Sequence, residues 1–183
     1  MQLFTSDSHA ALWADIEIGA NALVIHYIVE NRSRMAIHLF NRIWDRCRAD
    51  GYQVDPDRVD IEIRQEQAIV SKKLAARPED MDFEFMHIPC VTEVMPSASF
   101  TEHVSVALPL VPRTPYLRDV GTIPRRRPLW FELGFARGGP FAAGAPTVTR
   151  IPGGTALHFA TFTQSRQCLL TLGPFGDVPT LED

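Results

Sequence analysis

The sequence contains few cysteines and no long apolar run. Its three cysteines, Cys47, Cys90 and Cys168, form no CxxC pair, so they do not make a disulfide framework, and we expect free thiols in a reducing compartment. No stretch approaches the roughly 20 apolar residues of a membrane-spanning helix. The start, MQLFTSDSHAALWADIEIG, lacks a basic region followed by an apolar one and so does not resemble a secretory signal. These absences predict a soluble, cytoplasmic protein with no membrane partner.

Basic residues are outnumbered by acidic ones. The chain has 18 Lys and Arg against 22 Asp and Glu, a formal net charge of −4. Residues 1–112 carry 10 basic and 17 acidic side chains, and residues 113–183 carry 8 and 5. Neither half has the basic excess typical of nucleic-acid binding, so we expect no nucleic-acid partner. Only Lys72 and Lys73 are lysines; the other basic residues are arginines.

Signatures of catalysis and of nucleotide binding are also missing. The chain has no GxSxG nucleophile motif, no GxGxxG and no GxxxxGK[ST]. The cysteines stand in no recognisable nucleophile context, and spacing alone pairs no two carboxylates as acid and base. We therefore predict no catalytic residues and no cofactor, and we favour a non-enzymatic protein.

The pattern that is present is alternation of apolar and polar residues, which indicates β-strands. Leu23, Ile25, Tyr27 and Val29 share one face of a predicted strand, and a polar break follows it. Only short helices are expected, over residues 7–14 and 41–49. The full set of predicted strands comprises residues 23–30, 35–40, 59–64, 100–110, 130–136, 155–162 and 168–172.

The fold predicted from these strands is all-β. A chain of 183 residues fits one domain, residues 1–183, with long Pro- and Gly-rich connections near 111–128 and 138–154. Seven to nine short strands with turns between them are typical of a sandwich of two antiparallel sheets. A jelly roll is the alternative.

Two segments carry a resemblance to known folds. YIVENRSRMAIHLF and VMPSASFTEHVSVALPL resemble passages of immunoglobulin-like and fibronectin-like sandwiches. The first looks like their strand, polar break and strand, in which the chain crosses between sheets. This resemblance implies an immunoglobulin-like β-sandwich and no catalytic residues. VENRSRMAIHLF is also similar to the start of bacterial intracellular proteinase-inhibitor domains, which implies an inhibitor as one possible function, although residues 111–150 have no counterpart there.

His26 and His38 lie on either side of this polar break. If residues 24–40 formed a hairpin, the two imidazoles would face each other at about 4.5–5.5 Å between Cβ atoms and could bind a metal. If the chain crosses to a second sheet, the two residues separate. We expect the crossing, with both histidines facing solvent, and so predict no metal site. A metal-dependent enzyme or metal-binding protein stays as an alternative, using some of His26, His38, His87, Cys90, His103 and His158.

The most concentrated polar feature is Pro124-Arg125-Arg126-Arg127-Pro128, followed by Trp130. Three like charges between prolines are expected to be exposed, because burying them together is prohibitive. Arginine binds carboxylates in a bidentate manner and stacks on aromatic rings. Arg125, Arg126, Arg127 and Trp130 are therefore predicted binding residues. The alternatives are a solvated loop or pairing with the chain's own acidic residues Glu79, Asp80, Asp82 and Glu84.

The function favoured by these observations is a non-enzymatic binding or interaction module that acts through loops and a sheet edge. Strand addition at an open edge is a common route to a partner. The partner would be another protein or a second copy of the chain. The two alternatives are the metal-dependent or metal-binding protein and the intracellular proteinase inhibitor.

Overall fold

The computed structural model of the protein describes residues 2–64, 66–78, 87–116, 121–138 and 145–182. Over these residues the regular secondary structure is almost wholly β-strand, and the one helical turn is the 3₁₀ turn η1, Gln164–Arg166. The predicted all-β class is therefore confirmed. In the same part of the chain, no helix has the length and apolar character required to cross a membrane.

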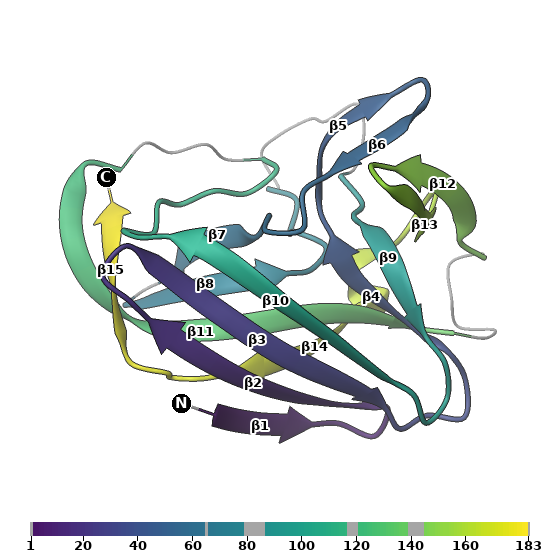
Figure 1. Ribbon diagram of the computed structural model, residues 1–183, viewed down its shortest axis with the longest axis horizontal. Helices are drawn as coiled ribbons and strands as arrows, with labels where there is room; N and C mark the ends of the chain where they lie inside the picture. The colour runs from purple at the N-terminus through teal and green to yellow at the C-terminus, as the bar shows by residue number, and fades with distance from the viewer. Residues whose placement is uncertain (1, 65, 79–86, 117–120, 139–144, 183) are drawn as a thin grey trace.

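The first sheet has four antiparallel strands in the order β1-β2-β3-β10. In Figure 1 they lie side by side across the front of the molecule. β2 and β3 are joined by a short turn, and β10 pairs with the other edge of β3. The strand bounds are β1 (Gln2–Ser6), β2 (Ala10–Ile18), β3 (Ala22–Asn31) and β10 (Ser99–Ala107).

The second sheet is organised around the long strand β11 (Ile123–Arg137). β8 and β4 pair with β11 at residues 129–133 and 135–137, and β15 and β14 pair with it at 123–128 and 131–135. The sheet order is β12-β13-β9-β4-β11-β8-β7, and β5 and β6 form a separate hairpin. The remaining bounds are β4 (Ile37–Arg42), β5 (Trp44–Arg48), β6 (Gly51–Val54), β7 (Asp60–Arg64), β8 (Gln67–Lys72), β9 (Cys90–Val94), β12 (Thr147–Ile151), β13 (Gly154–His158), β14 (Cys168–Leu172) and β15 (Asp177–Glu182).

Two features of this topology bear on the predictions. β3 and β4 lie in different sheets, so the polar break after β3 does carry the chain across as expected. β8 pairs with β11 in parallel, whereas the other strand pairs are antiparallel, so the second sheet is mixed rather than purely antiparallel. The finer immunoglobulin-like assignment, like the jelly-roll alternative, stays a prediction.

Apolar side chains on the facing sides of the two sheets form the main core. Alternate residues of β3, namely Leu23, Ile25, Tyr27 and Val29, are fully buried, as the period-two pattern predicted. Phe131 of β11 packs against Tyr27, with ring centroids 5.3 Å apart. A second apolar cluster covers the outer side of β4 and β11, and its members are Phe40, Leu74, Ile88, Val91, Ala136, Phe159 and Phe162.

A polar network also lies between the sheets. Glu102 of β10 receives hydrogen bonds through Oε2 from Lys72 Nζ at 3.0 Å, from Asn41 Nδ2 at 3.3 Å and from the Tyr27 hydroxyl. Its Oε1 lies 3.2 Å from Nη1 of Arg42. Lys72, Asn41 and Tyr27 are fully buried. A buried carboxylate is tolerated here because cations and hydrogen-bond donors surround it.

The two predicted helices are wrong. Residues 7–14 contain the start of β2, and residues 41–49 contain the end of β4 and all of β5. Most of β2 is buried, which gives it a nearly continuous apolar run that short-range periodicity does not separate from a helix. The predicted connection near 111–128 is shorter than expected, because residues 123–128 belong to β11 and pair with β15.

The contribution of the core is testable at Phe131. Replacing this buried ring, Phe131→Ala, should lower the free energy of unfolding by about 3–5 kcal/mol, because it removes apolar contacts and leaves a cavity. Phe4→Ala is the matched control: Phe4 is 51% exposed, and its loss should cost about 1 kcal/mol or less. Chemical denaturation of both variants measures the difference. Equal losses would show that the ring of Phe131 is not part of a packed core.

Candidate functional site

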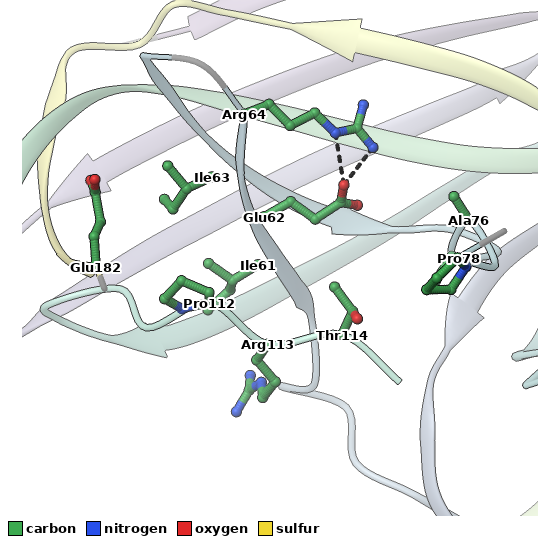
Figure 2. A pocket seen from close by; sticks show the side chains of 11 residues that line it. Ile61, Glu62, Ile63, Arg64, Ala76, Pro78, Pro112, Arg113, Thr114 and Glu182 are labelled. Atoms are coloured by element: carbon green, nitrogen blue, oxygen red, sulfur yellow. Dashed lines mark hydrogen bonds and ion pairs between the residues drawn. The ribbon is translucent and has the colours of Figure 1, made fainter. Parts of the chain in front are cut away.

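A cleft of about 310 Å³ lies at the edge of the second sheet. One wall is the edge strand β7, and the others come from the residues after β8 and from the segment around Arg113. Figure 2 shows Arg64 beside Glu62, with dashed lines joining the two, Glu182 on the left and Ala76 and Pro78 on the right. A concave site of this size with mainly apolar walls is a default candidate for ligand binding. The lining residues are Ile61, Glu62, Ile63, Arg64, Ala75, Ala76, Pro78, Pro112, Arg113, Thr114 and Glu182.

The polar wall of the cleft continues into a buried chain of charges. Arg64 donates from Nε to Oε2 of Glu62 at 2.7 Å, and Oε1 of Glu62 lies 3.0 Å from Nζ of Lys73. Lys73 Nζ also lies 2.5 Å from Oε2 of Glu132. Burial alone would raise the pKa of Glu62, but the charges and hydrogen bonds of Lys73 and Arg64 outweigh it and hold the pKa below its usual range. Glu62 is therefore a fixed anion at the wall of the cleft.

Asp60 lies two residues before Glu62 on the same face of β7, and it behaves in the opposite way. It is 1% exposed, and neither of its carboxyl oxygens has a hydrogen-bond partner. Burial and the nearby charge of Glu62 raise its pKa to about 7, against the charges of Arg58, Lys73 and Arg113. Two carboxyl groups on one strand face thus have pKa values shifted in opposite directions, a pattern that is common at functional sites.

The cleft is held in shape from its far side by Arg113. The backbone of Arg113 forms two hydrogen bonds with Ile61, at 2.7 and 2.8 Å. Its guanidinium donates from Nε and Nη2 to the carbonyl of Val59 at 3.3 and 3.2 Å. The segment around Arg113 is therefore fastened to the edge of β7 at one point, and the cleft opens beside it.

The predicted binding residues Arg125, Arg126, Arg127 and Trp130 do not form one site. Arg126 donates to the backbone carbonyl of Asp177 at 2.8 Å, and Arg127 makes a bidentate pair with Glu182, each bond 2.9 Å. Because alternate strand residues face opposite sides, Arg126 and Trp130 lie on one face of β11 and Arg125 and Arg127 on the other. The arginines thus lie on a strand beside the C-terminal strand, not on a loop. The acidic group Glu79, Asp80, Asp82 and Glu84 lies outside the described residues.

The two histidines of the polar break are separated, as the crossing predicted. His26 is exposed on β3, with Asp15 and His103 as its cross-strand neighbours. His38 is buried, so the prediction that it faces solvent was wrong. Its ring lies 5.5 Å from that of Phe159 and its Nε2 3.3 Å from Glu93. Burial lowers the pKa of His38 despite the charge of Glu93. The outer face of the second sheet is covered by the second apolar cluster, which sequence periodicity does not reveal.

The candidate metal ligands His87 and His158 lie against aromatic rings. His87 stacks on Trp44 at 3.9 Å and pairs its Nε2 with the Trp44 carbonyl at 2.7 Å. His158 stacks on Tyr52 at 4.6 Å. Burial, with a smaller effect of Cys47, raises the pKa of the Cys90 thiol to about 12. Within the described part of the chain, no three His, Cys, Asp or Glu residues are placed to hold a metal ion.

The residues around the cleft were missed by sequence reasoning. Asp60, Glu62 and Arg64 alternate with isoleucines, which predicts a solvated polar face of a strand. One signal was available: both lysines of the chain are adjacent, and they closely follow the apolar residues Ala68, Ile69 and Val70. In the structure both are buried, which a surface strand would not require.

Comparison with known proteins identifies no relative: no family model, no curated protein and no solved structure matches the chain.

The raised pKa of Asp60 predicts a pH-dependent stability. Between about pH 4 and 7 the folded chain holds a proton on Asp60 that the unfolded chain has released, so the stabilisation is lost as the pH rises toward 7. The free energy of unfolding of the wild type should therefore fall by about 2–3 kcal/mol relative to Asp60→Asn between pH 5 and pH 8. Urea unfolding at both pH values measures this. The exposed Asp50→Asn is the control, and an Asp60→Asn variant with the wild-type pH dependence would contradict the assignment.

The arginine strand makes a separate prediction. Arg127→Ala breaks the bidentate pair with Glu182 that joins β11 to β15, so it should lower the Tm measurably. Arg125→Ala, exposed on the same face, should leave the Tm unchanged. Thermal unfolding monitored by circular dichroism compares the two. Equal Tm values for both variants would mean that the pair with Glu182 adds no stability.

Proposed function

We propose that the protein is a non-enzymatic binding module whose site is the cleft beside β7, and that its partner is an extended segment of another protein. The observation that carries this proposal is the cleft itself. It combines apolar walls with a rim of charged side chains that are already held in ion pairs. Such a site buries an apolar side chain well, while the fixed charges orient the polar groups around it.

The edge of β7 favours an extended chain as the occupant. The N–H and C=O of Ile61 bond outward to Arg113. Alternate residues of an antiparallel strand direct their N–H and C=O groups to the same side, so the N–H and C=O of Ile63 also point outward. Within the described chain, these two groups of Ile63 have no backbone hydrogen-bond partner on that side. A strand-like ligand would hydrogen-bond to Ile63 and place one of its side chains in the cleft, which is recognition by strand addition.

The position of the cleft also agrees with a module that acts through a sheet edge and loops. β7 is the last strand in the order of its sheet. The walls opposite it come from two connections, residues 75–78 and 112–114. A ligand there would contact an edge and two loops at once, and binding would require no rearrangement of the core.

Filling the cleft tests the proposal. Extended peptides selected from a random library on the wild-type protein should bind Ala76→Trp at least about tenfold more weakly, a loss of about 1.4 kcal/mol, because the indole occupies the cleft. Ala76 is exposed and lines the cleft, and Ala20→Trp, in the exposed turn between β2 and β3, is the matched control. Calorimetric titration measures the affinities.

Two results would overturn the proposal. One is a selection that enriches no peptide above background. The other is a set of enriched peptides that bind Ala76→Trp as tightly as they bind Ala20→Trp, which would locate the binding surface elsewhere on the molecule.

A further inference from the structure

Lys72, Glu102 and Asn41 are brought together between the sheets from three different strands. The amine of Lys72 and the carboxamide nitrogen of Asn41 both lie within hydrogen-bonding distance of one oxygen, Oε2 of Glu102, at 3.0 and 3.3 Å. Lys72 and Asn41 are both fully buried. Oδ1 of Asn41 has no hydrogen-bond partner. A primary amine, a carboxamide and a carboxylate are thus neighbours in a largely buried site.

These three groups have the chemistry of an amide-forming reaction. An amine becomes a nucleophile when it loses its proton, and burial away from water favours the neutral form. Burial lowers the pKa of Lys72, against the opposing charge of Glu102. A carboxylate in contact with both nitrogens can move protons between them as a general base and then a general acid. Holding the groups in one place replaces an encounter in solution, which accelerates such reactions strongly.

We propose that Lys72 and Asn41 become joined by an isopeptide bond, with Glu102 as the proton carrier. The bond that forms is between Nζ of Lys72 and Cγ of Asn41, and the bond that breaks is between Cγ and Nδ2 of Asn41. Two protons of the Lys72 ammonium pass through Glu102 to the departing nitrogen. The products are a secondary amide and one ammonium ion, so atoms and charge balance without any oxidant or cofactor.

The surrounding side chains position these groups. Lys72 Nζ also donates to the carbonyl of Pro56 at 2.7 Å, which fixes the amine. Arg42 Nη1 lies 3.2 Å from Oε1 of Glu102, the oxygen that faces neither nitrogen, and fixes the position of the carboxylate. The hydroxyl of Tyr27 bonds to the same Oε2 as the two nitrogens. Arg42 and Tyr27 are positioning residues, since neither loses or gains an atom in the reaction.

The bond would join two strands that the sheet leaves unpaired. β8 and β4 pair with successive stretches of the same edge of β11, residues 129–133 and 135–137. They are not paired with each other in the sheet order. A link between residues 41 and 72 would close the gap and shorten the free loop in the unfolded chain, which stabilises the fold as other cross-links do.

The intact mass of the purified wild-type protein tests the bond directly. We expect the mass to be lower than the sequence mass by one ammonia, and proteolytic mapping to yield a branched peptide that joins Lys72 to Asn41. A folded wild-type chain with its full sequence mass overturns the proposal. So does an ammonia loss that maps to another residue, such as Gln2 or Asn21.

Variants identify the roles of the three groups. Lys72→Arg and Glu102→Gln should keep the full mass. Asn41→Asp should lose water instead of ammonia and end at the mass of the linked wild type. Lys73→Arg is the matched control: Lys73 is also buried, but among the described residues its amine pairs with Glu62 and Glu132, so this variant should still lose ammonia. If a variant does not fold, the wild-type mass and the peptide map decide by themselves.

Discussion

The structure depends on how one buried carboxylate is neutralised. Glu102 projects from β10 of the first sheet into the space between the sheets, where Lys72 and Arg42 of the second sheet meet it. A carboxylate buried without such partners would cost several kcal/mol, so the two sheets are held in one register. In the register of β10 along β3, Glu102 lies opposite Tyr27, whose hydroxyl donates to the same carboxylate. Apolar side chains make up most of the buried residues between the sheets. The contacts of Glu102 add specific pairings between side chains of the two sheets.

Lys73, which follows Lys72 in the chain, connects the region beside the core to the candidate site. Lys72 and Lys73 are consecutive, so they point to opposite faces of the sheet. Lys72 faces the first sheet and Glu102, whereas Lys73 faces outward and lies between Glu62 and Glu132. Glu62 is in turn part of the cleft wall. One short segment therefore places the Lys72 nitrogen in the core and the Lys73 nitrogen beneath the cleft, and the position of β8 sets both.

Much of the strand content was predictable, because burial on one face leaves alternation in the sequence. The strands at residues 22–31 and 168–172 match the predicted ranges closely. β8 was missed because it is buried on nearly every residue and so loses the alternation, and β2 was missed because its first residues, Ala10 to Leu12, are buried in succession. Arg125–Arg127 were predicted as a loop, but pairing with β15 makes them part of a strand. The candidate site was not predictable, because its charged residues resemble a solvated face until the chain around them is placed.

The sequence alone determined that the protein is all-β and that Ile25, Tyr27 and Val29 face the core. These properties follow from local alternation, which acts over a few positions. The crossing between sheets after residue 31 was expected from the resemblance to immunoglobulin-like sandwiches, and the structure confirms it. Only the tertiary structure decided which strands pair with β11, that His38 is buried, and that Asp60, Glu62 and Lys73 lie beside a cleft. It alone placed Asn41, Lys72 and Glu102 together, because contacts between residues far apart in the chain depend on how the sheets pack.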